Sequence, residues 1–190
     1  MSDDGRCPWG VGDPLMAAYH DDEWGRPVRS ESGLYERMCL EAFQSGLSWR
    51  TILNKRPGFR KAFADFDVRA VADFGDDDFD RLMADAGIVR NRAKILAAIN
   101  NARATLELDG ELPDIIWSHA PARGAGRATI ADVPGSSPES VALSKALKKR
   151  GFVFVGPTTA YAMMQACGLV NDHMASCPAW KECERAYNEA

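Results

Sequence analysis

A helical hydrophobic period runs from Gly33 to Ser45 and stops at a glycine. Apolar side chains recur there at positions i, i+1, i+4, i+5, i+8 and i+9, namely Leu34, Tyr35, Met38, Cys39, Ala42 and Phe43. This spacing is typical of one face of an α-helix, so we expect an amphipathic helix here. Gly46 is suited to end that helix in a left-handed conformation. Ser48 is suited to cap a new helix that begins at Trp49.

Glu41 lies at the edge of this apolar face. At about 100° per residue it falls about 20° from Leu34 and about 60° from Met38. Half-burying a carboxylate is costly unless a donor reaches it. Two interpretations remain open: Glu41 reaches solvent, or it forms one wall of a pocket that recognises an amino-bearing, cationic ring.

The remaining pattern also predicts helices. We expect short helices over residues 14–20, 48–56, 58–64, 68–74 and 77–86, and longer ones over 91–108, 138–150 and 157–167. Pro57 is expected to end one helix, and Asp67 and Asp76 to cap two others. In the helix 91–108 the expected inner residues are Ala93, Ile95, Leu96, Ile99 and Ala102. There is no alternation of strands with helices and no internal repeat, so the predicted fold class is all-α.

Two segments lack such a pattern. Residues 110–137 are rich in Pro, Gly, Ala and Ser and are expected to form a long connection. The tail after Cys177 shows no constraint that we can interpret.

Length and composition are those of one ordinary globular domain. The chain has 190 residues, of which 46% are hydrophobic and 26% charged. No apolar run approaches the roughly 18 residues of a membrane span, and the acidic start does not resemble a signal peptide. We therefore expect a cytoplasmic protein that does not associate with membranes.

The formal net charge of −4 hides a segregated distribution. Residues 65–80 hold seven Asp and one Arg, whereas residues 81–103 hold five basic residues and one acid. Lys145, Lys148, Lys149 and Arg150 form a second basic cluster. These clusters are either solvated helix faces or a basic surface that suits nucleic acid.

The cysteines and histidines suggest a metal site. His173 and Cys177 are one helical turn apart, and Cys7 and His20 form a second pair near the other end of the chain. Together they make a Cys₂His₂ set, which binds zinc structurally and leaves no position for a catalytic water. Simple burial of the four is the alternative, and Cys183 is an alternative fourth ligand. Five cysteines make a disulfide framework unlikely.

A second motif lies between residues 78 and 99. Two helices flank a turn that contains Gly87, which resembles a helix-hairpin-helix, although Val89 stands where a second glycine is usual. Backbone N–H groups of such a turn bind a phosphate without reading sequence. Arg90, Arg92 and Lys94 are expected to surround that phosphate, and an ordinary helical hairpin is the alternative.

Four aromatic residues lie close to Glu41 in the sequence: Trp9, Tyr19, Trp24 and Trp49. Flat rings around one carboxylate suit an extruded base, which needs stacking on its faces and hydrogen bonds at its edge. Such rings are more often part of an ordinary core, which is the alternative for each of them.

Taken together, these motifs resemble the bacterial 3-methyladenine DNA glycosylase I family, within the helix-hairpin-helix superfamily. The stretches that carry the resemblance lie at residues 7–10, 13–15, 19–25, 39–49, 85–90, 143–152 and 164–173.

The resemblance implies an all-helical fold in two parts, one formed by residues 1–32 with about 138–190 and the other by about 33–110. It implies that Cys7, His20, His173 and Cys177 hold a structural Zn²⁺ that joins the two ends of the chain. It also implies that Glu41 accepts hydrogen bonds from a flipped base. Tyr19 and Trp49 would stack on that base, while Trp9 and Trp24 wall the pocket.

The expected partner is alkylated double-stranded DNA, and the expected oligomeric state is a monomer. Leu47 would fill the gap left in the duplex, and Gly87, Val89, Arg90 and Arg92 would contact the DNA. Glu41, kept ionised, would favour a cationic ring over neutral adenine. The expected reaction is hydrolytic excision of 3-methyladenine that leaves an abasic site, without strand cleavage. The alternatives are a non-enzymatic module that binds damaged DNA and a zinc hydrolase or deaminase, which would need an open ligand position.

Overall fold

A computed structural model of the chain describes residues 5–189, which form helices joined by turns and contain no β-strand. The predicted all-α fold is confirmed. The elements are η1 (Pro8–Gly10), α1 (Pro14–Asp22), α2 (Glu31–Gln44), α3 (Trp49–Ala62), η2 (Ala64–Phe66), α4 (Val68–Ala72), α5 (Asp76–Ala84), α6 (Arg92–Leu106), α7 (Leu112–Trp117), η3 (Ile130–Asp132), α8 (Pro138–Lys148), α9 (Pro157–Ala166) and α10 (Pro178–Glu189). None of these helices is both long and apolar enough to span a membrane.

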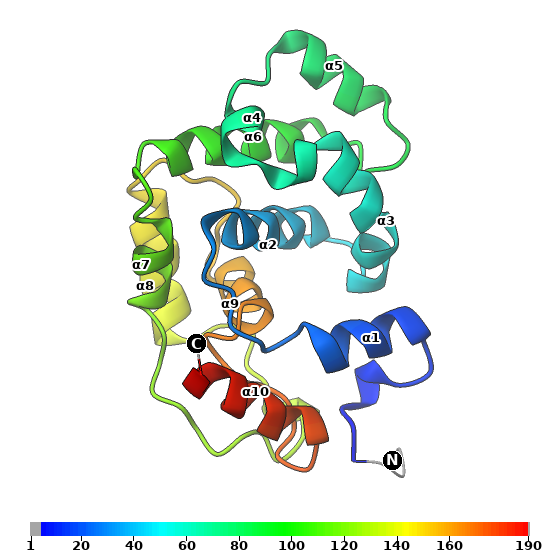
Figure 1. Cartoon of the computed structure of the whole chain (residues 1–190), viewed down its shortest axis with the longest axis vertical. Coiled ribbons are helices and arrows are strands. Elements are labelled where there is room, and N and C mark those ends of the chain that lie inside the picture. The colour runs from blue at the N-terminus through cyan, green and yellow to red at the C-terminus, as the bar shows by residue number, and fades with distance from the viewer. Residues whose placement is uncertain (1–4, 190) are drawn as a thin grey trace.

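Helix α2 lies at the centre of the molecule, with α3 to α6 on one side and α7 to α9 on the other (Figure 1). Its apolar face is wide enough to serve two cores. Tyr35 and Phe43 pack with α3, α4 and α6, whereas Leu34 and Met38 pack with α7, α8 and α9. Any side chain that α2 places between these cores is therefore held on a rigid element.

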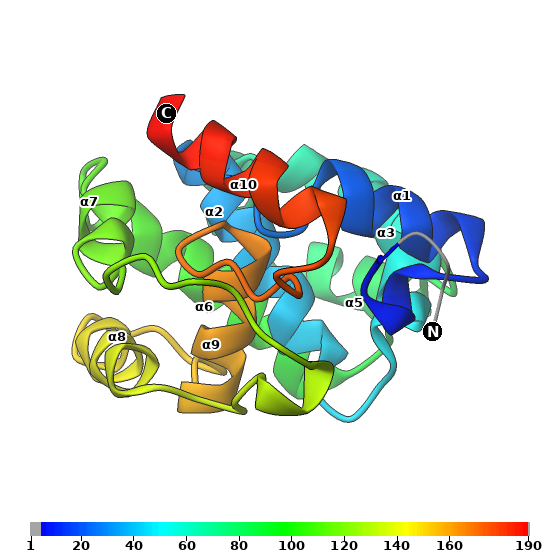
Figure 2. The same cartoon turned by 90° about the horizontal axis from the view of Figure 1, so that it is seen from below.

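The N-terminal segment contacts the loop before α10. The start of α10 lies near this segment (Figure 2), Ala179 in its first turn packs with Cys7, and the backbone N–H of Met174 donates to Sγ of Cys7 at 3.3 Å. This arrangement brings the N-terminal and C-terminal cysteines and histidines into one cluster.

Most helix starts follow the predicted capping chemistry. The side chains of Asp13, Ser48 and Asp67 each accept a hydrogen bond from the first turn of the helix that follows. Gly46 ends α2 with a φ of +81°. The prediction for Asp76 was one residue late, because Gly75 is the N-cap of α5.

The prediction that Pro57 ends a helix was wrong. Helix α3 continues through it to Ala62, so no separate helix covers residues 58–64. A proline inside a helix loses one hydrogen bond and strains the preceding turn. Here Ile52 before the proline and Phe59 after it are buried in the same core, and that packing outweighs the local cost.

Two helices were missed. Helix α7 lies inside the expected connection, where Leu112 and Ile116 form a short buried face. Helix α10 occupies the tail and buries Ala179 and Cys183 one turn apart. In α6, by contrast, two residues expected to face inward, Ala93 and Leu96, are exposed.

Candidate active site

A cavity of about 300 Å³ opens between α1, α2, the start of α3 and α9. Its lining residues are Trp9, Met16, Tyr19, Trp24, Glu41, Gln44, Trp49, Ala162 and Gln165. All five residues that sequence analysis assigned to base binding and catalysis are among them. The structure therefore brings Glu41 together with the four predicted aromatic rings.

The rings form two pairs around the cavity. Tyr19 and Trp49 lie with their centroids 5.2 Å apart at an interplanar angle of 46°. Trp9 meets Trp24 edge-on, with centroids 4.9 Å apart. Flat apolar surfaces therefore face the cavity from more than one direction, as stacking on an aromatic ligand requires.

Two polar atoms of this wall have no partner. The hydroxyl of Tyr19 and the indole Nε1 of Trp49 are buried, and no group of residues 5–189 forms a hydrogen bond with either. Buried polar groups in native proteins are nearly always paired, so these two atoms are available to a ligand or an ordered water in the cavity.

Glu41 is only 6% exposed, and its carboxyl group forms no hydrogen bond with the described residues. Burial raises the pKa of Glu41 to about 8, although the nearby Arg37 acts in the opposite direction. The interpretation that Glu41 reaches solvent was therefore wrong. An ionised Glu41 facing a cationic base stays a prediction, because burial by itself favours the protonated carboxyl group.

An ion-pair network lies behind the pocket. Both carboxylate oxygens of Glu23 accept from Arg56 at 2.7 Å, and one of them also accepts from Arg37 at 2.7 Å. Burial alone would raise the pKa of Glu23, but these charge-assisted bonds outweigh it and lower the pKa to about 2. The network ties the end of α1 to α2 and α3, which carry the pocket residues.

The four predicted metal ligands form one buried cluster. Their donor atoms all lie within 4.8 Å of one another. Sγ of Cys7 lies 3.7 Å from Nδ1 of His173, and Sγ of Cys177 lies 3.6 Å from Nε2 of His20. A tetrahedral zinc site has ligand-to-ligand distances of roughly 3.3 to 3.8 Å, so the donor set fits such an ion.

The outer nitrogens of the two imidazoles are already engaged. Nδ1 of His20 bonds the carboxylate of Asp21 at 2.8 Å, and Nε2 of His173 bonds the carbonyl of Trp24 at 3.0 Å. Metal-binding histidines are usually oriented in this way by their second nitrogen. Cys183, the alternative ligand, lies outside the cluster and contacts the carbonyl of Trp24 at 3.5 Å.

Helices α5 and α6 flank the turn that contains Gly87. The N–H of Gly87 does not point to solvent, because it donates to Oδ1 of Asp85 at 2.7 Å. Val89 is half-buried against the core, which gives a packing reason for a valine at this place in the motif. Arg90 and Arg92 are exposed, and Arg92 lies over the ring of Phe79.

Lys94 does not join Arg90 and Arg92 at the turn, contrary to expectation. It is buried, and its ammonium group donates to the carbonyls of Phe43 and Ser45 at 2.8 and 2.6 Å. The contact fixes the end of α2 against α6. Leu47, two residues further on, is 38% exposed.

Four lining residues were missed: Met16, Gln44, Ala162 and Gln165. Gln44 is three residues after Glu41 on α2, so helical periodicity alone places it on the same face. Gln165 and Ala162 come from α9, and no local pattern links that helix to α2.

Known proteins resemble this chain in sequence and in fold. The family model described as methyladenine glycosylase matches residues 9–180. The chain is 51% identical to DNA-3-methyladenine glycosylase 1 of Escherichia coli strain K12, over 90% of this chain and 95% of that protein.

Two solved structures share the fold. A crystal structure of 3-methyladenine DNA glycosylase I superposes with a TM-score of 0.87 at 47% identity, covering 91% of this chain and 98% of that one. The Staphylococcus aureus 3-methyladenine DNA glycosylase I, described for its recognition of 3-methyladenine, superposes with a TM-score of 0.86 at 33% identity, covering 93% and 96%.

Proposed function

Since the chain belongs to the methyladenine glycosylase family, we propose that it excises 3-methyladenine from alkylated DNA in the cavity between α1, α2, α3 and α9. One observation carries the proposal. A ring-sized cavity is lined by aromatic side chains whose buried polar atoms, Oη of Tyr19 and Nε1 of Trp49, lack partners beside an unpaired carboxyl group.

Base recognition would use the faces and the edge of the flipped ring. Tyr19 and Trp49 stack on the base, and Trp9 and Trp24 close the pocket. Glu41 accepts hydrogen bonds from the ring edge. The cavity can hold a base only after it has left the duplex stack, so base flipping is part of the proposal.

The chemistry needs little acid assistance from the protein. Methylation at N3 gives adenine a positive charge, so when the N-glycosyl bond breaks, its electron pair neutralises the departing base. Water adds to the sugar carbon and loses a proton, which leaves free 3-methyladenine and an abasic site. Nothing in the pocket offers a lysine for Schiff-base chemistry, because none of its lining residues is a lysine.

Glu41 would supply the selectivity between damaged and normal adenine. A cationic ring beside the buried carboxyl group lowers its pKa, so that the proton leaves and an ion pair forms. Neutral adenine forms no ion pair, so it does not offset the free-energy cost of ionising the buried carboxyl group. The discrimination therefore depends on the charge that methylation creates.

DNA binding would use exposed residues on the turn between α2 and α3 and at the start of α6. Leu47, on the turn after α2, enters the gap left by the base, while Arg90 and Arg92 beside the Gly87 turn contact the backbone phosphates. The exposure of Leu47 and of both arginines supports this assignment. The monomeric state stays a prediction.

The Cys₂His₂ cluster would hold Zn²⁺ as a structural ion. Cys7 comes from the N-terminal segment, His20 from α1, and His173 and Cys177 from the loop before α10. A closed set of four ligands stabilises the fold and takes no part in hydrolysis. The bound ion would fix the two ends of the chain behind the pocket.

The test is to incubate the protein with alkylated duplex DNA and identify the released bases by mass spectrometry. Release of 3-methyladenine from an otherwise intact strand is expected. Binding of the duplex without any released base would contradict the proposal and favour the non-enzymatic module.

A further inference from the structure

The pocket contains one more polar atom without a partner, the side-chain oxygen of Gln165. Gln165 lines the cavity from α9, and its amide nitrogen turns away to donate to Oδ2 of Asp172 at 2.8 Å. No described residue donates to its Oε1. The nitrogen end of this amide therefore faces the interior.

Asp172 fixes that orientation. It is 1% exposed, and its Oδ1 accepts from Nε of Arg127 at 2.7 Å. A carboxylate paired with an arginine can only accept hydrogen bonds, so it selects the nitrogen of the neighbouring amide. Since the nitrogen must face Asp172, the oxygen is the end that remains for the cavity.

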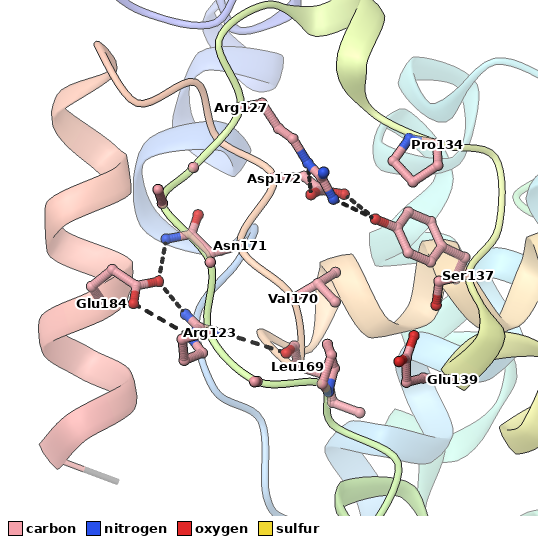
Figure 3. Close-up of a pocket in the computed structure, with 16 residues that line it drawn as sticks. Arg123, Arg127, Pro134, Ser137, Glu139, Leu169, Val170, Asn171, Asp172 and Glu184 are labelled. Atoms are coloured by element: carbon pink, nitrogen blue, oxygen red, sulfur yellow. Dashed lines mark hydrogen bonds and ion pairs between the residues drawn. The ribbon is translucent and has the colours of Figure 1, made fainter.

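A second helix residue braces the same carboxylate. The hydroxyl of Tyr161, one turn before Gln165 on α9, donates to Oδ2 of Asp172 at 2.7 Å, and Arg127 also reaches that hydroxyl at 3.2 Å. Figure 3 shows Arg127 and Asp172 meeting in a second, polar cavity, which Tyr161 and Glu184 also line and Gln165 does not.

Arg127 is itself held by the backbone. Its N–H donates to the carbonyl of His173 at 3.4 Å, and its carbonyl accepts from the N–H of Ala175 at 2.8 Å. No function could be assigned to residues 110–137 from the sequence. They contribute Arg127, whose backbone is hydrogen-bonded to the loop that carries His173.

We propose that Gln165 is a specificity residue whose amide oxygen accepts a hydrogen bond from the exocyclic amino group of the base, and that Asp172 and Arg127 are positioning residues that hold this oxygen in the pocket. The inference rests on the proposed function, because it assumes that 3-methyladenine enters the cavity. Glu41 and Gln165 would then present two acceptors, from α2 and α9, to one amino-bearing ring.

The test uses binding of free bases, followed by tryptophan fluorescence, with 3-methyladenine and with 3-methylpurine, which lacks the amino group. Gln165→Met removes the oxygen with little change of shape. It should weaken binding of 3-methyladenine about three- to tenfold, the effect of one hydrogen bond, and leave 3-methylpurine unchanged.

Asp172→Asn tests the positioning role. Its oxygen stays with Arg127, so its amide nitrogen faces Gln165 and turns the amide of that residue round, with a donor now in the pocket. Discrimination between the two bases should fall by a similar factor. In the Gln165→Met background, Asp172→Asn should not reduce discrimination any further. If Asp172→Asn only disturbed the structure, its loss of discrimination would instead add to that of Gln165→Met.

The matched control is Glu184→Gln, in the polar cavity of Figure 3. It weakens a different ion pair, between Glu184 and Arg123 at 2.5 Å, and should leave binding of both bases unchanged. Equal binding of 3-methyladenine by the wild type and Gln165→Met, or equal losses for both bases, would overturn the inference. Failure of the wild type to bind 3-methyladenine at all would instead contradict the proposed function.

Discussion

The indole ring of Trp24 packs edge-on against the imidazole of His173, with 4.7 Å between the ring centroids. Trp9 makes a similar contact with His20, at 4.9 Å. The Cys₂His₂ cluster and the candidate base pocket therefore share a wall, in which two pocket rings make T-shaped contacts with two ligand side chains. Loss of a bound ion would therefore change the positions of Trp9 and Trp24 in the pocket.

Replacing Cys177 with Ser should remove zinc and lower stability. Three remaining ligands bind the ion far more weakly, and the ends of the chain lose their shared anchor. We expect a fall of several kcal/mol in the free energy of unfolding, on the order of what a structural zinc contributes in small domains. Metal content and urea denaturation measure this.

Cys39→Ser is the control for the zinc experiment, since Cys39 is buried in the core away from the cluster. It should lose stability through packing but keep the ion. A wild-type protein without zinc, whose stability does not respond to added zinc, would contradict the structural-zinc proposal.

Replacing Glu41 with Gln should reduce excision by roughly a hundredfold or more, because a neutral amide cannot pair with the cationic ring. Single-turnover release of 3-methyladenine measures the loss. Full activity of the Glu41→Gln variant would remove Glu41 from the mechanism.

The same variant should respond differently to pH. The pKa of Glu41 is raised in the folded state from 4.5 to about 8, so the unfolded chain gives up this proton first as pH rises. The wild type should therefore lose stability between pH 4.5 and 8, by an amount on the order of 4 kcal/mol, whereas Glu41→Gln avoids that loss. Denaturation at pH 5 and pH 8 measures the difference, and a gap that does not widen with pH would refute it.

Tyr19→Phe should separate stability from binding. The hydroxyl of Tyr19 is buried without a partner, so its removal should stabilise the empty protein by about 1 kcal/mol. Binding of free 3-methyladenine should weaken, because the pocket loses a hydroxyl group that can form a hydrogen bond with the base. A variant that is less stable than the wild type would show that the hydroxyl has a protein or water partner in solution.

Leu47→Ala should slow excision from duplex DNA about tenfold or more while leaving the affinity for free 3-methyladenine unchanged, because the leucine would act on the gap in the duplex and not on the base. Leu96→Ala is the control, since Leu96 on α6 is exposed to a similar degree. Equal effects of the two substitutions would exclude a specific role for Leu47.

The sequence indicated the central helix well because α2 is regular. The angular position of Glu41 between Leu34 and Met38 places it beside the buried face, and the structure finds it almost completely buried. Helix N-caps such as Ser48 were equally predictable, because a cap depends only on one side chain and the helical turn that follows it.

Features that depend on packing between distant segments could not be predicted from the sequence. Pro57 stays inside α3 because the core on both sides of it is continuous. Lys94 reads as a DNA-facing cation in sequence, yet its ammonium group finds two carbonyls at the end of α2. Gln165 lines the pocket only because α9 packs against α2, and no periodicity in the sequence predicts that contact.

The most direct measurement is the structure of this chain crystallised with 3-methyladenine. We predict the ring between Tyr19 and Trp49, with its amino edge towards Glu41 and the formerly orphaned Oη of Tyr19 or Nε1 of Trp49 within hydrogen-bonding distance of the base or of a water that it orders. A base bound outside the cavity, or a cavity still empty at saturating 3-methyladenine, would contradict the account.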